Sequence, residues 1–114
     1  MPVSPCINTV ERLGATRRTR SINSRLLGLS ATLAKEYGRK GITSNVLSPG
    51  FFDTDMTRSD MSGANREFWL KYCPLGRLGE LPEVAEVVTF LASPGAGFIN
   101  GQELRVNGGL DWAP

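Results

Sequence analysis

The most regular hydrophobic pattern in the chain begins near residue 24. Apolar side chains recur there at the spacing of one helical face, at Leu26, Leu29, Leu33 and Tyr37. Gly38 and Gly41 follow, and glycine commonly ends a helix. The pattern therefore predicts an amphipathic helix over residues 24–39.

Two short strands are predicted further along the chain. The first covers residues 42–47 and stops at Pro49-Gly50, because proline cannot donate a ladder hydrogen bond and glycine permits a sharp turn. The second covers residues 103–107, where side chains alternate before Gly108-Gly109. We interpret the two glycines as the tight end of that strand.

Two helices are predicted between these strands. Residues 62–72 form the weaker one, and Pro82 opens the other at a favoured first-turn position. Glu83 and Glu86 lie near its positive end. Its apolar face consists of Val84, Val87, Val88 and Leu91. Helix, strand, helix, helix and strand in this order are typical of an α/β fold.

The predicted sheet is incomplete. Two parallel strands leave an open edge and an uncovered apolar face, so a sheet of this kind needs further strands. A nucleotide-binding sheet also needs a Gly-rich turn between a strand and a helix. Gly95, Gly97 and Gly101 follow a helix and precede a strand, so we interpret them as loop residues.

Charge divides the chain near residue 25. Residues 1–25 contain five arginines and one glutamate, a net charge of +4, whereas residues 26–114 have a net charge of −2. The apolar residues of the first segment follow no regular period. We therefore expect an unstructured, Arg-rich segment over residues 1–25 and a folded part over residues 26–114.

Composition excludes several kinds of chemistry. The chain has no histidine, which removes Ser-His-Asp and Cys-His catalysis and His-ligated zinc. Cys6 and Cys73 are far apart and form no C-x-x-C pair. No apolar run approaches the roughly 18 residues of a membrane helix, and the first residues lack the apolar core of a secretory signal, so we expect neither element. We expect one small domain in the reducing cytosol.

Three motifs occur in a characteristic order: GITSNVLSPGFFDTDMT at residues 41–57, PLGRLGELPEVAEVVTFLAS at 74–93 and FINGQELRVNGGL at 98–110. Together they resemble the C-terminal half of a short-chain dehydrogenase/reductase, with similarity to 3-oxoacyl-reductase-like and sugar/polyol-reductase-like members. The resemblance covers about residues 26–110. It implies part of a Rossmann-type doubly wound parallel sheet and NAD(P)-dependent interconversion of ketones and secondary alcohols.

By this resemblance, the loop after the first strand holds the nicotinamide half of NAD or NADP. The implied cofactor-contacting residues are Pro49, Gly50, Phe52 and Thr54. Phe52 would present backbone groups to the carboxamide, and Thr54 a hydroxyl to the carboxamide or the adjacent phosphate. A flat amide requires a donor and an acceptor at fixed spacing, which a turned backbone supplies.

The same loop has a simpler interpretation as a strand-ending turn. In that case Asp53, Thr54 and Asp55 cap the helix that follows. Asp53, Asp55 and Asp60 lack the spacing of a calcium-binding loop, so we predict no metal site.

Two further features have open interpretations. Phe68, Trp69 and Tyr72 lie on the segment that covers the substrate in relatives, but aromatic residues at helical spacing are also typical of a core. Arg77 is most simply a surface residue or the partner of a carboxylate.

The departure from the family lies upstream of residue 26. An ungapped alignment places Thr19 and Asn23 where the family has the Tyr and Lys of its Tyr-x-x-x-Lys pair, and neither can replace the phenol or the ammonium. Cys6 falls at the position of the family's serine, which we regard as coincidence. We therefore predict no catalytic residue here.

This departure leaves the activity of the chain in question. We expect weak or no NAD(P) binding and no activity from the chain alone. The alternative is a non-catalytic pseudoenzyme subunit or an inert truncation product. A complete member would act on a small carbonyl or alcohol, and the chain could form homo-oligomers or hetero-oligomers with a full-length relative. Neither a nucleic acid nor a membrane partner is predicted.

Residues 1–25 have three possible origins. A misread frame or a splice variant that joins the family sequence after its catalytic helix has begun is the explanation we favour. Their Arg-rich, acid-poor composition also fits a mitochondrial presequence. A nucleic-acid-binding arm is the third possibility, although five arginines without interleaved aromatics are a weak footprint.

Overall fold

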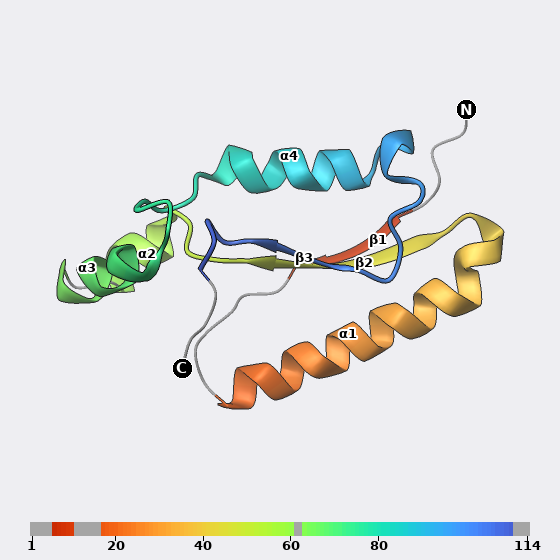
Figure 1. Cartoon of the computed structure of the whole chain (residues 1–114), viewed down its shortest axis with the longest axis horizontal. Helices are drawn as coiled ribbons and strands as arrows, with labels where there is room; N and C mark the ends of the chain where they lie inside the picture. Colours follow the sequence, from red (N-terminus) through yellow and green to blue (C-terminus); the bar gives the residue numbers. More distant parts are fainter. Residues whose placement is uncertain (1–5, 11–16, 61–62, 111–114) are drawn as a thin grey trace.

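The computed structural model describes residues 6–10, 17–60 and 63–110. Their helices and strands are arranged as Figure 1 shows. In chain order they are β1 (Cys6–Val10), α1 (Arg17–Tyr37), the 3-10 turn η1 (Gly38–Lys40), β2 (Thr43–Pro49), α2 (Asp55–Asp60), α3 (Gly63–Tyr72), α4 (Leu81–Leu91), the 3-10 turn η2 (Pro94–Ala96) and β3 (Glu103–Val106).

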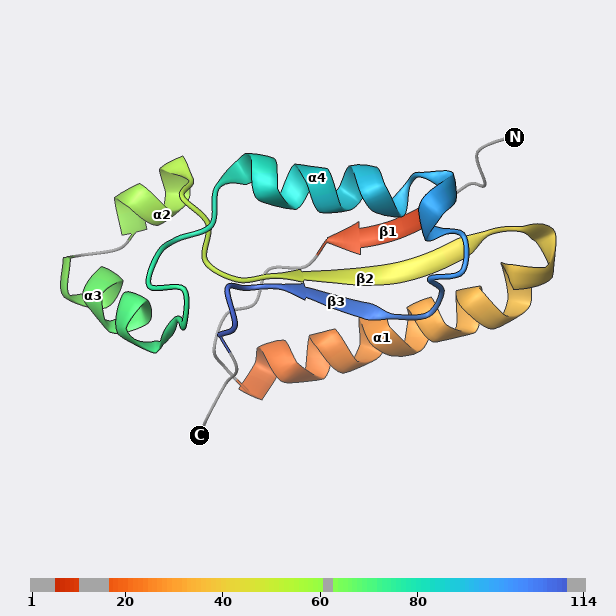
Figure 2. The same ribbon diagram turned by 45° about the horizontal axis from the view of Figure 1, so that its top comes forward.

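The three strands form one parallel sheet in the order β1-β2-β3. Thr43 pairs with Cys6 on one side of β2, and Val46 pairs with Glu103 on the other. Helix α4 covers one face of the sheet and α1 covers the other (Figure 1). Helices α2 and α3 lie beyond the carboxyl end of β2 (Figures 1 and 2). The predicted α/β fold with a parallel sheet is confirmed.

The structure corrects the prediction at the amino-terminal side. The sheet has a third strand, β1, and α1 begins at Arg17, seven residues before the predicted start at Ser24. The expectation that residues 1–25 are unstructured is therefore wrong for residues 6–10 and 17–25. The sequence of β1, Cys-Ile-Asn-Thr-Val, is too short and mixed to indicate a strand by alternation. Its strand conformation depends on pairing with β2.

The other boundaries lie close to the predicted ones. Strand β2 extends to Pro49, two residues past the expected end, and β3 ends at Val106. Gly41 follows η1 with a φ of 77°, a conformation that favours glycine. Helix α2 was expected only as the helix that follows the loop, without bounds, because six residues are too few to show a hydrophobic period. Within the described residues, no helix combines the length and apolar character that crossing a membrane requires.

The main core lies between β2 and α4. Leu47 on β2 is 1% exposed and packs with Leu91 at the end of α4 and Ala96 in η2. On the opposite face, the hydroxyl groups of Ser30 on α1 and Ser44 on β2 are 3.0 Å apart and hydrogen-bonded. Both faces of β2 are therefore covered, as is usual for a strand inside a parallel sheet.

We expect Leu47→Ala to lower the free energy of unfolding by about 2–5 kcal/mol, since it removes a fully buried side chain and leaves a cavity. Leu29→Ala is the matched control, because Leu29 is 56% exposed on α1, and its effect should stay within about 0.5 kcal/mol. Urea unfolding followed by circular dichroism measures both values. Equal losses in the two variants would mean that the core has been wrongly located.

Candidate cofactor-binding edge

The candidate site begins where β2 ends. The Gly50 N–H donates to the Val106 carbonyl oxygen at 2.8 Å. A Cβ atom at Gly50 would lie 2.7 Å from the Cα atom of Asn107. Glycine is therefore required here because the ends of β2 and β3 approach closely, and this requirement is independent of any ligand.

The next residues are fixed by Gly79. Gly79 N–H donates to the Phe51 carbonyl at 2.9 Å, and Asp53 N–H donates to the Gly79 carbonyl at 2.8 Å. The Phe52 side chain is buried against Gly79, where an added Cβ would lie 2.6 Å from the phenyl ring. This parallel bridge turns the Phe52 N–H away from Gly79. Within the described part of the chain that N–H has no hydrogen-bond acceptor.

Thr54 caps α2. Its hydroxyl oxygen accepts the Thr57 N–H at 3.2 Å, and the Thr54 N–H donates to the Thr57 hydroxyl at 2.8 Å. The helix-cap interpretation is confirmed for Thr54. Sequence reasoning missed Thr57, whose hydroxyl lies 2.7 Å from the Phe52 carbonyl and can donate to it. The T-x-x-T spacing, which brings two hydroxyls together across one helical turn, could have indicated it.

The acidic residues of the loop pair with an arginine. Arg58 donates two hydrogen bonds to the Asp53 carboxylate, at 2.8 and 3.0 Å, and lies 3.6 Å from an Asp55 oxygen. The hydrogen bond from Arg58 lowers the pKa of Asp53. Arg58 thus links the loop to the first turn of α2.

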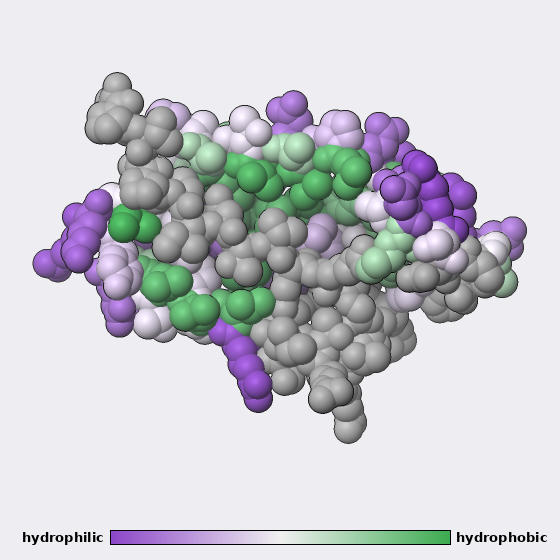
Figure 3. Space-filling view, turned by 180° about the vertical axis from the view of Figure 1, so that it is seen from behind, coloured by the Kyte–Doolittle hydropathy of each residue, from purple (hydrophilic) through white to green (hydrophobic). Residues whose placement is uncertain are grey.

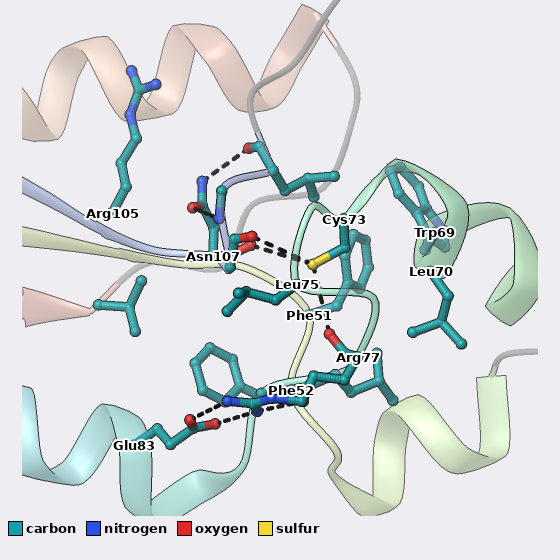
Figure 4. Close-up of a pocket in the computed structure, with 16 residues that line it drawn as sticks. Phe51, Phe52, Trp69, Leu70, Cys73, Leu75, Arg77, Glu83, Arg105 and Asn107 are labelled. Atoms are coloured by element: carbon teal, nitrogen blue, oxygen red, sulfur yellow. Dashed lines mark hydrogen bonds and ion pairs between the residues drawn. The ribbon is translucent and has the colours of Figure 1, made fainter.

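A cavity of about 230 Å³ lies behind this loop (Figure 4). Its walls come from the loop, α3, the segment before α4 and the turn after β3. The rings of Phe51 and Trp69 face each other in this wall, with centroids 4.4 Å apart. Trp69 therefore lines a cavity, whereas Tyr72 is 55% exposed and does not line it. The side chain of Phe68 lies outside the described part of the structure.

The four predicted cofactor-contacting residues do not all line the cavity. Phe52 lines the cavity, whereas Pro49, Gly50 and Thr54 do not. All four nevertheless lie at the carboxyl end of β2, on one short stretch of backbone. This is the edge at which open α/β sheets bind their ligands. Their contact with a cofactor remains a prediction.

The turn after β3 closes the opposite wall of the cavity. Gly108 and Gly109 have φ angles of 65° and 85°, which favour glycine. A Cβ at Gly108 would lie 2.9 Å from the Cys73 sulfur. The Asn107 side-chain amide donates to the Leu110 carbonyl at 2.9 Å. The predicted tight end of the last strand is confirmed.

An ion pair fixes the segment that carries Gly79. Arg77 donates two hydrogen bonds to the Glu83 carboxylate, at 2.8 and 2.6 Å, and one to the Leu78 carbonyl at 3.1 Å. Glu83 also accepts the Glu80 N–H at 2.8 Å. The hydrogen bonds from Arg77 and, to a smaller extent, the one from the Glu80 N–H lower the pKa of Glu83 to about 2. Arg77 is thus a carboxylate partner, one of the two roles expected of it.

No acid–base pair is found at this edge among the described side chains. Thr19 and Asn23 lie on α1 and Cys6 lies on β1, but their side chains are outside the described part of the structure.

Comparison with known proteins settles the family. The family profile described as enoyl-(acyl carrier protein) reductase matches residues 21–111. The chain belongs to the short-chain dehydrogenase/reductase family. Its parallel sheet with a helix on each face is part of the Rossmann-type fold of that family.

Curated relatives of this short-chain dehydrogenase/reductase agree with that assignment. A 3-oxoacyl-(acyl-carrier-protein) reductase from Pseudomonas aeruginosa is 51% identical over 85 residues, which are 75% of this chain and 34% of the relative. The enzyme of the same name from Chlamydia trachomatis is 48% identical over 85 residues, with the same coverage. The chain spans about a third of the length of these relatives.

One relative extends the similarity towards the amino end. The Vibrio harveyi 3-oxoacyl-(acyl-carrier-protein) reductase is 37% identical over 108 residues, which are 95% of this chain and 43% of the relative. A match of that length includes most of residues 1–25. A sequence boundary at residue 25 remains a prediction.

We expect the Arg77–Glu83 pair to make stability depend on pH below about 5. The pKa of Glu83 is lower in the folded chain than its ordinary value of 4.5, so the pair stabilises the fold above that value. This contribution is lost as the pH falls towards about 2. The melting temperature should therefore fall further over this interval in the wild type than in Glu83→Gln. Glu86→Gln, which changes an exposed carboxylate of the same helix, should keep the wild-type dependence.

Proposed function

We propose that this chain carries the nicotinamide-facing part of an NAD(P)-dependent oxidoreductase that interconverts a ketone and a secondary alcohol. The single observation that supports the proposal most strongly is the backbone of Phe52. Its N–H has no acceptor in the described part of the chain. The N–H groups of Asp53, the next residue, and of Gly79, the residue opposite Phe52, are both hydrogen-bonded.

The loop fits the nicotinamide end of the cofactor. A carboxamide offers one acceptor and two donors, and Phe52 presents a free N–H and a carbonyl with a second lone pair beside Thr57. Pro49 and Gly50 would place this backbone against the ring, and Thr54 would need to exchange its helix-cap bond for a cofactor contact. NAD and NADP share the nicotinamide, so this loop would accept either one.

The described residues do not fit the rest of the cofactor. No Gly-rich turn links a strand to a helix within the described residues, and the phosphates would have no backbone cradle. The cofactor would supply hydride transfer when bound. This chain's own part would be to orient the nicotinamide and to exclude water from one side of it.

The relatives suggest the class of substrate. The curated proteins described above are named as 3-oxoacyl-(acyl-carrier-protein) reductases, so a 3-oxoacyl thioester is the substrate that we propose for the whole protein. The carbonyl of such a substrate requires a proton donor. An ungapped alignment places Thr19 and Asn23 at the positions of the family's tyrosine and lysine, and neither side chain can act as that donor near neutral pH.

The second candidate function is non-catalytic. The substitutions at Thr19 and Asn23 favour it, because positioned acid–base catalysis contributes about 10²–10⁴ in rate. In that case the chain would act as a subunit of a complete relative or would be an inert product.

We expect the purified 114-residue chain to oxidise no NADPH in the presence of acetoacetyl-coenzyme A, because the proton donor and the phosphate cradle are missing. Absorbance at the NADPH band measures the rate, with the full-length Pseudomonas aeruginosa reductase as the positive control. Turnover by this chain that disappears in Thr19→Ala or Asn23→Ala would contradict the assignment of an inactive pair.

A further inference from the structure

The sequence contains two Asn-Gly pairs, Asn100-Gly101 and Asn107-Gly108, which lie on either side of β3. In such a pair the backbone nitrogen of glycine can attack the side-chain carbonyl of asparagine, because glycine has no Cβ to hinder the approach. Asparagine is one of the thermolabile residues of proteins. The two pairs share this chemistry, so a difference in their reactivity has to come from the structure around them.

The two glycines have the same backbone conformation but different hydrogen bonds. The φ angles of Gly101 and Gly108 are 70° and 65°. The Gly101 N–H donates to the Ser44 carbonyl at 2.8 Å, whereas the Gly108 N–H has no acceptor among the described residues. Gly108 is half-buried and the next residue, Gly109, is exposed, so this turn borders the solvent. The nitrogen of Gly108 is therefore free to lose its proton to a base from solvent, and that of Gly101 is held by β2.

The Asn107 side chain bonds to its own turn. Its oxygen accepts the Gly109 N–H at 3.1 Å, and its amide nitrogen donates to the Leu110 carbonyl at 2.9 Å. The bond from Gly109 forms an Asx turn, which folds the side chain back over the peptide between Asn107 and Gly108. A donor on the side-chain oxygen also stabilises the negative charge that forms there when a nucleophile attacks the adjacent carbon.

The Asn100 side chain instead joins distant elements. Its oxygen accepts the Ser44 N–H of β2 at 2.9 Å, and its amide nitrogen donates to the Ala34 carbonyl of α1 at 3.3 Å. Releasing Asn100 requires both of these elements to separate from the loop before β3. Releasing Asn107 requires only one turn to open, and local opening costs less free energy than the separation of packed elements.

We propose that Asn107 is a site of spontaneous deamidation and that the fold protects Asn100 from the same reaction. The deprotonated Gly108 nitrogen forms a bond to the Asn107 Cγ atom, and the side-chain amide takes a proton from water and leaves as ammonia. Water then opens either carbonyl of the resulting succinimide ring, which yields aspartate or isoaspartate. The net reaction consumes one water and releases one ammonia, and it is independent of any reductase activity.

Deamidation changes a wall of the cavity behind the candidate site. Asn107 and Gly108 both line this cavity (Figure 4). A carboxylate has no N–H to donate to the Leu110 carbonyl, so that hydrogen bond is lost. Isoaspartate also adds one carbon atom to the main chain between β3 and the two glycines. Each event thus alters the turn that closes the cavity and adds a negative charge to it.

The modified chain keeps its main core. Hydrophobic surface lies along α4 on the face that Figure 3 shows, where the valines of α4 pack against Leu47, Leu91 and Ala96. The side chain of Asn107 is not part of this core. We therefore expect the product to remain folded, so that it can be isolated by ion exchange through its added negative charge.

Peptide mass spectrometry of the folded 114-residue chain, incubated at mildly alkaline pH, tests the proposal. Trypsin cleaves after Arg105, so the two asparagines fall in separate peptides. Each conversion raises the peptide mass by one unit, and electron-transfer fragmentation distinguishes isoaspartate from aspartate. A sample digested at zero time corrects for conversion during digestion, and circular dichroism verifies that the incubated chain is folded.

We expect Asn107 to convert at least about tenfold faster than Asn100 in the folded chain, because the opening free energies differ. Isoaspartate should be among the products, and the rate should rise with pH, since the attacking nitrogen has to lose its proton. The matched control is the same chain in guanidinium chloride. There the two asparagines should convert at similar rates, because both precede glycine and the structure that distinguishes them is gone.

Three results would overturn the proposal. The first is equal conversion of Asn100 and Asn107 in the folded chain. The second is no conversion of Asn107 in the folded chain over a period in which the unfolded chain converts. The third is conversion of Asn107 to aspartate alone, since direct hydrolysis of the side chain produces no isoaspartate and does not involve Gly108.

Discussion

The burial of β2 on both faces and both edges is the constraint on which the described structure depends. Its neighbours are β1 and β3 in the sheet, α4 on one face and α1 on the other. Four of its polar residues, Thr43, Ser44, Asn45 and Ser48, are nevertheless buried. A buried polar group destabilises a fold unless it is hydrogen-bonded, so the partners of these residues fix the position of the surrounding segments.

Those partners belong largely to the chain just before β3. The Ser44 N–H donates to the Asn100 side chain at 2.9 Å, and the Asn45 amide bonds both Ile99 and Gln102 at 3.1 Å. The Ser48 hydroxyl donates to the Glu103 carboxylate at 2.8 Å. Strand β3 is therefore aligned with β2 by side chains as well as by the ladder. As a result, the carboxyl ends of the two strands stop together at the candidate site.

The sequence predicted the elements that carry a strong period and missed those that depend on distant contacts. Helix α4 and strand β3 were found from Pro82 and from alternation before two glycines. Strand β1 was missed because only its pairing with β2 distinguishes Cys-Ile-Asn-Thr-Val from an irregular segment. The same holds for the site. The resemblance identified the loop at Pro49–Thr54, but nothing in the local sequence indicated that Gly79, 27 residues after Phe52, would set its backbone.

Two backbone hydrogen bonds to Gly79 hold the loop after β2, and they leave the Phe52 N–H free for a ligand. Native-state hydrogen exchange at three backbone amides tests this arrangement most directly, because exchange slows where an amide is hydrogen-bonded. The account predicts slow exchange at Asp53 and Gly79 and faster exchange at Phe52. Protection of Phe52 equal to that of the other two amides, or no protection at Asp53 and Gly79, would contradict it.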